Sequence, residues 1–168
     1  CSFDKANRSS DKTIRSKISF DNSIEILRNL KKDLKISITS DVHETSQVDK
    51  LAEILDVIQI PAFLCRQTDL IKAAAQTKKI VNVKKGQFLS HKEISNIINK
   101  IENENNKKIL ITERGNSFGY NYLINDFKGI HFMKEFGYPI IFDSTHSVQL
   151  PGGLGKKSGG AREFVAPL

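Results

Sequence analysis

The sequence has 168 residues, which is enough for one domain with a sizeable hydrophobic core. No apolar run approaches the ~20 residues that a membrane helix needs, so we expect no membrane span. The net charge of +7 favours an anionic partner, but sugar phosphates, nucleic acid and ordinary surface lysines all satisfy it. Two cysteines, Cys1 and Cys65, are too few for a disulfide framework, so we expect a cytoplasmic protein.

Both ends of the sequence indicate a fragment of a longer protein. It begins at Cys1 rather than at a methionine, and its final residues, 161–168, have the character of a helix beginning. We therefore expect part of a larger chain.

Short β-branched runs alternate with segments of helical periodicity. Strands are expected at 36–39, 57–60, 80–83, 109–112 and 139–142. Helices are expected at 24–30 behind Asp21 or Asn22, 45–55 with Thr45 as N-cap, 69–76, 94–101 behind a Ser90/Glu93 capping box, and 121–136. This alternation predicts parallel strands joined by crossover helices, hence an α/β protein.

A polar cluster follows each expected strand, which favours a (β/α)8 TIM barrel. In that fold the carboxyl ends of all strands meet at one mouth. An open doubly wound sheet would instead use only the clusters near its switch point. A complete barrel has eight units and about 250 residues. We therefore expect residues 1–168 to form a single domain that is an incomplete arc of one barrel.

Several cations are placed at this mouth. They repel one another unless an anion lies between them, and arginine forks match phosphate or carboxylate oxygens. A ligand with more than one anionic group would account for so many cations. The alternative is that half of them are ordinary surface residues. The cations are Lys5, Arg8, Arg66, Lys84, Lys85 and Arg114.

Three further features have competing interpretations. His146 fits a metal ligand, a proton carrier or a hydrogen-bonded structural histidine. The glycine-rich segment 151–160 fits a loop over the mouth or a plain linker. Cys65 fits a buried thiol better than a nucleophile. The sequence has no HExxH or CxxC pair and no interleaving of aromatic and basic residues, so it predicts no complete metal site and no nucleic-acid surface.

The sequence closely resembles the 3-deoxy-D-manno-octulosonate 8-phosphate synthase family. The matching stretches are SFDKANRSS (2–10), TSDVHE (39–44), IQIPAFLCRQTDL (58–70), NVKKGQF (82–88), TERGNSFGYN (112–121) and FDSTHSVQLPGGLGKKSGGAREF (142–164). The resemblance places the fragment between the end of the second barrel strand and a point just past the seventh. One departure is Arg15, which is not followed here by the glycine-rich turn common in the family.

The family condenses phosphoenolpyruvate with arabinose 5-phosphate and water. The resemblance implies that phosphoenolpyruvate is held by Lys5, Arg66, Lys84 and Arg114, with Gln87 and Gln59 lining the pocket. It implies that arabinose 5-phosphate is held by Asn7, Arg8 and Ser9. Catalytic roles fall to Lys5, His146 and Asp41.

The resemblance also bears on cofactors and partners. It implies no organic cofactor, membrane or nucleic acid, and a homotetramer. The wording PGGLGKKSGG (151–160) looks more like the metal-dependent members. In these, His146 would bind a divalent ion whose other ligands lie outside this chain.

Three alternatives stay open. The sister activity uses erythrose 4-phosphate, but its family usually reads KPRTS where this chain has KANRSS (5–10). A catalytically dead barrel could act as a binding subunit. A nucleic-acid binder would also use the positive charge, with a salt-sensitive affinity.

Overall fold

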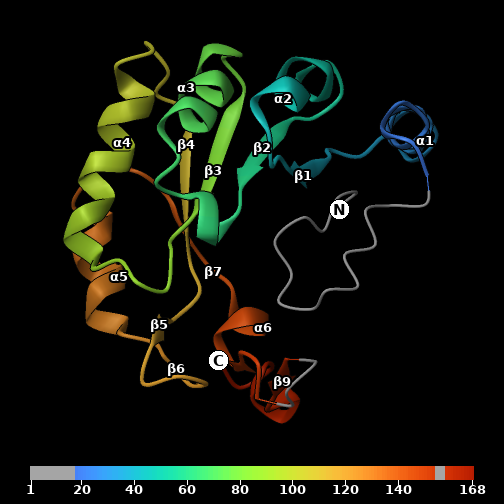
Figure 1. The fold of residues 1–168 in the computed structure, drawn as a ribbon. Coiled ribbons are helices and arrows are strands. Elements are labelled where there is room, and N and C mark those ends of the chain that lie inside the picture. Colours follow the sequence, from blue (N-terminus) through green and yellow to red (C-terminus); the bar gives the residue numbers. More distant parts are fainter. Residues whose placement is uncertain (1–17, 154–157) are drawn as a thin grey trace.

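The computed structural model describes residues 18–153 and 158–168, and a parallel five-stranded sheet lies at its centre (Figure 1). The strand order is β1-β2-β3-β4-β7, so neighbours in the sheet follow one another along the chain. This confirms the α/β prediction. Within the described residues the sheet is open from β1 to β7, so barrel closure stays a prediction. The strands are β1 (Thr39–Asp41), β2 (Val57–Ile60), β3 (Ile80–Lys84), β4 (Ile109–Glu113) and β7 (Ile140–Phe142).

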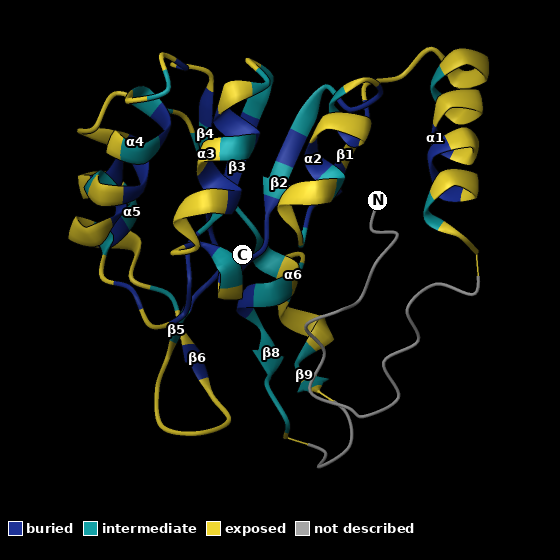
Figure 2. Ribbon diagram, turned by 45° about the horizontal axis from the view of Figure 1, so that its top comes forward, coloured by how far each residue is buried: buried dark blue, intermediate teal, exposed yellow. Residues whose placement is uncertain are grey.

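Helices α2 to α5 cover one face of this sheet, and α1 stands apart beyond β1 (Figures 1 and 2). Two short antiparallel hairpins, β5–β6 and β8–β9, follow β4 and β7. The helices are α1 (Phe20–Leu34), α2 (Thr45–Ala52), α3 (Thr68–Gln76), α4 (Ile94–Glu102), α5 (Phe127–Lys134) and α6 (Ser144–Ser147), with 3-10 turns η1 (Ala62–Leu64), η2 (His91–Glu93) and η3 (Arg162–Phe164). The hairpin strands are β5 (Asn116–Ser117), β6 (Leu123–Ile124), β8 (Gln149–Leu150) and β9 (Gly159–Gly160).

The strand register separates an apolar face from a polar one. Ile58 pairs with Val81, and Val81 pairs with Ile109, so these side chains share one face. They are buried against the apolar stripes of the helices, such as Leu51 of α2 and Ile71 of α3. The alternate residues of the same strands face the other way, and most of them are polar near the strand ends. They are Asp41, Gln59, Asn82, Lys84 and Thr112, with Arg114 and Asp143 just beyond β4 and β7.

The prediction of a helix over 121–136 was wrong in its first half. Residues up to Ile124 form the β5–β6 hairpin, and α5 begins only at Phe127. Asp126 is the N-cap, because its carboxylate accepts a hydrogen bond from the Lys128 amide at 3.0 Å. The helix therefore cannot extend upstream of its cap.

The first strand was placed three residues too early. Ile36 is 49% exposed and lies before the ladder, whose first pair is Thr39 with Val57. The Ile38 amide donates instead to Asp56 Oδ2 at 2.8 Å. Asp41 is consequently the last residue of β1.

Of two helix starts predicted from capping residues, one is confirmed and the other is displaced by one residue. The Ser90/Glu93 capping box is confirmed, and it opens η2, which leads directly into α4. Thr45 is not the N-cap of α2, because Glu44 is, and the Glu44 amide donates to Gln47 Oε1 at 3.3 Å. Among the described helices, none has the length and apolarity needed to cross a bilayer.

Candidate active site

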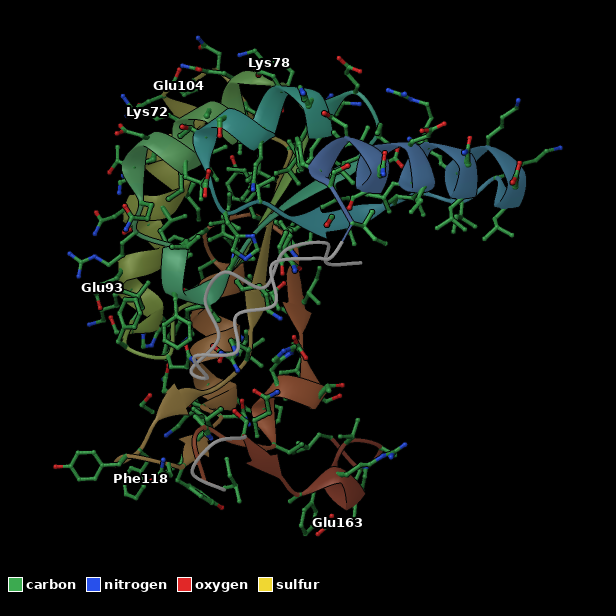
Figure 3. All side chains as sticks on the ribbon, turned by 45° about the vertical axis from the view of Figure 1, so that its right-hand side comes forward. Lys72, Lys78, Glu93, Glu104, Phe118 and Glu163 are labelled. Carbon is green, nitrogen blue, oxygen red and sulfur yellow. The ribbon has the colours of Figure 1, made fainter. Side chains whose placement is uncertain are left out.

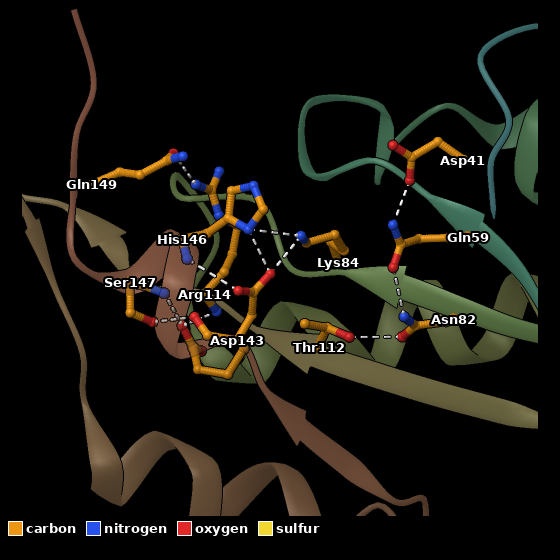
Figure 4. Close-up of polar contacts among 12 residues, drawn as sticks. Asp41, Gln59, Asn82, Lys84, Thr112, Arg114, Asp143, His146, Ser147 and Gln149 are labelled. Atoms are coloured by element: carbon orange, nitrogen blue, oxygen red, sulfur yellow. Dashed lines mark hydrogen bonds and ion pairs between the residues drawn. The ribbon is translucent and has the colours of Figure 1, made fainter. Parts of the chain in front are cut away.

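A chain of side-chain hydrogen bonds runs across the polar face of the sheet, from β4 to β1 (Figure 4). Thr112 Oγ1 donates to Asn82 Oδ1 at 2.8 Å, and Asn82 Nδ2 donates to Gln59 Oε1 at 3.0 Å. Gln59 Nε2 then donates to the Asp41 carboxylate. Every donor points toward Asp41, so the chain of hydrogen bonds ends on a carboxylate oxygen that accepts. These four side chains hold one another in fixed orientations.

Beside this chain, the ends of β3 and β7 bring three charged or titratable groups together. Lys84 Nζ lies 2.6 Å from Asp143 Oδ2, and His146 Nδ1 lies 2.7 Å from the same oxygen (Figure 4). Asp143 Oδ1 also accepts the His146 amide at 3.0 Å, as the N-cap of α6. A neutral histidine that donates from Nδ1 to a carboxylate keeps its lone pair on Nε2. Nδ1 of His146 is thus engaged by Asp143, whereas Nε2 makes no hydrogen bond to the described residues.

The electrostatics of Asp143 follow from these partners. Burial alone would raise its pKa, but hydrogen bonds from His146 and Lys84 outweigh it and hold the pKa well below the usual range. Asp143 is therefore ionised at neutral pH and offsets the charge of Lys84. An incoming anion would have to compete with Asp143 for that lysine.

Arg114 is the second cation of the site and keeps an unused donor. Its side chain donates from one terminal nitrogen to Gln149 Oε1 at 3.3 Å, while Nε is buried and has no partner among the described residues. Burial lowers its pKa, and the charges of Asp143 and Glu113 oppose that shift. Gln87 lies three residues after Lys84 in the sequence and is also buried. Its Oε1 atom has no hydrogen-bond partner among the described residues. Buried polar atoms without partners cost about 1–3 kcal/mol, which a polar ligand would relieve.

The prediction that Lys85 lies at the mouth was wrong, because its side chain is 1% exposed and pairs with Glu113 on the opposite face of the sheet. The other predicted site residues lie apart from this cluster or outside the described residues. Arg66 is exposed and lines a separate hollow with Glu93, Asn96 and Lys100, so its role at the mouth stays a prediction. Lys5, Asn7, Arg8 and Ser9 lie outside the described residues. Of the predicted loop 151–160, residues 159–160 form β9 and pair with β8, and 154–157 lie outside the described part.

The described residues of this site do not supply a complete set of metal ligands. No group of three His, Cys, Asp or Glu side chains within 18–153 and 158–168 is placed to hold an ion. A protein metal site takes three or four such ligands, so His146 Nε2 would need partners from elsewhere. The imidazole of His146 is a suitable ligand for a divalent ion, but the described residues do not complete its coordination.

Sequence reasoning did not assign roles to Asn82, Thr112, Glu113 or Asp143. Asp143 was seen only as part of a polar cluster after a strand. For Asn82, Thr112 and Asp143 the missing signal was the period of two: residues at alternate positions from Asn82 to Lys84 and from Thr112 to Arg114 share the polar face. Following that alternation would have identified the face as a whole.

A parallel α/β sheet with polar groups at the carboxyl ends of its strands occurs in many unrelated enzymes, and comparison with known proteins narrows this class to one family. The sequence matches the family described as the DAHP synthetase I family over residues 1–168, and this chain belongs to that family. It is 53% identical over 167 residues to the 2-dehydro-3-deoxyphosphooctonate aldolase of Trichlorobacter lovleyi, covering 99% of this chain and 61% of that protein. It is 51% identical over 167 residues to the protein of that name from Geotalea daltonii, with the same coverage, and 54% identical over 164 residues to that of Pelobacter propionicus, covering 98% and 60%. The chain thus spans about three-fifths of the length of these relatives.

Proposed function

We propose that this protein condenses phosphoenolpyruvate with D-arabinose 5-phosphate and water, releasing 3-deoxy-D-manno-octulosonate 8-phosphate and phosphate. The observation that carries the proposal is the 50–54% identity to proteins named 2-dehydro-3-deoxyphosphooctonate aldolase, which extends over nearly the whole chain. The activity would serve the synthesis of the eight-carbon acid of lipopolysaccharide. In the proposed enzyme the sheet is part of a (β/α)8 barrel, and its polar face lines the interior.

The polar face suits this reaction because both substrates are anions. Carbon 3 of the enol attacks the sugar aldehyde, water adds at carbon 2, and phosphate leaves. Lys84 and Arg114 would hold the phosphate and carboxylate of phosphoenolpyruvate, together with Lys5 and Arg66. Cations at this position offset the mutual repulsion of the substrates and orient the attack.

Two further side chains have proposed roles near the reacting carbons. His146 would stand beside the reacting carbons, with its ring held through Nδ1 by Asp143. Asp41 would act as a fixed carboxylate, ordered by Gln59. Gln87 would line the phosphoenolpyruvate pocket, while Asn7, Arg8 and Ser9 would hold arabinose 5-phosphate.

We also propose that a divalent metal ion binds at His146 Nε2, with its other ligands outside the described residues. Such an ion would polarise a water or the aldehyde oxygen as a Lewis acid. The support is the free Nε2 and the 41% exposure of the His146 side chain. Loss of activity with a chelator, restored by added metal, would support this proposal, and full activity in the chelated protein would overturn it.

The enzyme is further proposed to be a cytoplasmic homotetramer. The support within the structure is the β5–β6 hairpin, which extends from the body of the fold and carries Phe118 (Figure 3). Phe118 and Tyr122 are 65% and 57% exposed, and exposed aromatic groups of this kind are typical of interfaces. Sedimentation of the natural full-length protein tests the assembly, and a monomer at working concentrations would overturn it.

One assay tests the reaction. Phosphate release from phosphoenolpyruvate is followed with arabinose 5-phosphate or with erythrose 4-phosphate, using the natural full-length protein. We expect release with arabinose 5-phosphate only. Release with erythrose 4-phosphate instead would assign the sister activity, which the family description also covers, and no release with either sugar would leave a binding subunit.

A further inference from the structure

A buried ion pair lies directly behind the two cations of the candidate site. Lys85 Nζ is 3.4 Å from Glu113 Oε2, and the two side chains are 1% and 4% exposed. Lys85 follows Lys84 at the end of β3, and Glu113 precedes Arg114 at the end of β4. Because side chains alternate across a strand, the ion pair faces the helix layer while Lys84 and Arg114 face the opposite side.

Glu113 holds the backbone that carries Arg114. Its Oε1 accepts hydrogen bonds from the Arg114 amide at 2.9 Å and from the Gly115 amide at 2.5 Å. Gly115 has φ +94°, a conformation that L side chains rarely adopt, so the chain turns sharply directly after Arg114. The carboxylate of Glu113 thus fixes the turn from which the arginine side chain extends.

Lys85 in turn fixes Glu113 and the segment after Lys84. The Lys85 amide donates to Thr112 O at 2.8 Å, which continues the pairing of β3 with β4. Its ammonium group donates to Leu89 O at 3.3 Å and also to Asn116 Oδ1 of β5. Within the described residues, the hydrogen-bond partners of this ammonium group are all protein oxygens, and its side chain is only 1% exposed.

Buried charges are costly, so such a pair is weak evidence for stability as such. The position of the Lys85–Glu113 ion pair suggests a role in orienting the neighbouring cations. Both members are sequence neighbours of site cations, both sit at the carboxyl edge of the sheet, and both bind the backbone that orients those cations. A displacement of about 1 Å at a site of this kind can lower activity by about 100-fold.

We propose that Lys85 and Glu113 are positioning residues that hold Lys84 and Arg114 at the spacing required by a dianionic substrate. This inference deepens the proposed function and rests on it, since the substrate held there would be phosphoenolpyruvate. Neither residue touches the substrate. They act from the reverse face of the sheet by fixing the ends of β3 and β4.

The test compares Lys85→Met with the double variant Lys85→Met/Glu113→Gln in the natural full-length protein. The single variant leaves the Glu113 carboxylate buried without its counter-ion, whereas the double variant removes both charges and keeps an oxygen for the Arg114 and Gly115 amides. The matched control is Lys92→Met, because Lys92 is an exposed lysine in η2. Folding of each variant is checked by its thermal unfolding midpoint.

We expect the phosphoenolpyruvate Kd, measured by titration calorimetry, to rise at least about tenfold in Lys85→Met and to recover most of that loss in the double variant. The KM for arabinose 5-phosphate should stay within about twofold. A merely structural role would lower the folded fraction and kcat but leave the Kd of the folded molecules unchanged. An unchanged Kd in folded Lys85→Met overturns the inference while leaving the proposed function intact.

A second measurement separates the inference from the proposed function. Hydrogen exchange of the Arg114 and Gly115 amides should be faster in Lys85→Met than in the control. If the wild-type protein does not bind phosphoenolpyruvate, the proposed function fails. Hydrogen exchange still tests the positioning role in that case, because exchange of the two amides at the same rate in Lys85→Met and in the control would overturn it.

Discussion

Lys84 and Asp143 form a 2.6 Å ion pair between the ends of β3 and β7, the two strands on either side of β4. Both side chains are mostly buried, at 12% and 18% exposure, and His146 shares the same carboxylate oxygen. Asp143 therefore serves two purposes: it fixes the histidine ring and it offsets the charge of the lysine. The orientation of His146 and the charge balance at Lys84 both depend on this carboxylate.

Asp143→Asn should lower activity by about 10–100-fold, because the amide no longer selects the tautomer of His146 and no longer offsets the charge of Lys84. Steady-state kinetics of the full-length protein give the result. Asp49→Asn, at an exposed position of α2, is the control and should change nothing. Equal kcat in the two variants would contradict the role given to Asp143.

The pH dependence of stability should reveal Asp56. A hydrogen bond from Lys31 and one from the Ile38 amide lower the pKa of this carboxyl, despite partial burial. Because the folded-state pKa lies below the unfolded value of about 3.9, the stabilisation is present above that value and is lost as pH falls through the folded pKa. Asp56→Asn should therefore lower the free energy of unfolding at pH 7 by about 1 kcal/mol, a figure reduced by solvent screening of a side chain that is 34% exposed.

Urea unfolding at a series of pH values measures this difference. The gap between wild type and Asp56→Asn should stay constant above pH ~5 and narrow below pH ~4. Asp33→Asn, on the exposed side of α1, serves as the control. A gap that widened on acidification would show that the carboxyl is not held ionised by Lys31.

The order of strands and helices was predictable because it depends on local periodicity. The buried strands contain β-branched residues and the helices have apolar stripes, as in α4. Errors occurred where one long-range contact decided the outcome. The start of β1 depends on Asp56, 18 residues away from Ile38 in the chain, and local propensity carries no sign of that bond.

The site shows the same division between local and long-range information. Lys84, Arg114 and His146 were identified from their positions after strands, and the structure brings Lys84 and His146 to 3.3 Å. Asp143 and Glu113 were not assigned, because each is defined by partners on other strands. Arg66 lines a separate hollow with Glu93 and Lys100, so its role at the mouth stays a prediction.

Tyr138 should titrate at unusually high pH. Burial and a hydrogen bond to Glu102 Oε1 raise its pKa to about 12. Tyr138→Phe should remove an absorbance step of tyrosinate near pH 12, whereas Tyr120→Phe, at a fully exposed position, should leave that step in place. Loss of the hydrogen bond should also cost about 1 kcal/mol of stability at pH 7. A step that survives in Tyr138→Phe would contradict the assignment.

Arg114→Lys tests whether the guanidinium fork is used. Lysine keeps the charge but lacks the Nε donor, which is buried without a partner among the described residues. If that donor meets phosphoenolpyruvate, losing a charge-assisted hydrogen bond of about 1.5–3 kcal/mol raises the KM for this substrate by about 10–100-fold. The KM for arabinose 5-phosphate should hardly change, since its phosphate is expected at Arg8 and Ser9.

The control for the substitution itself is Arg28→Lys, because Arg28 is an exposed arginine paired with Glu53. A rise in the KM for arabinose 5-phosphate alone would move Arg114 to the other substrate and reverse the proposed division of the site.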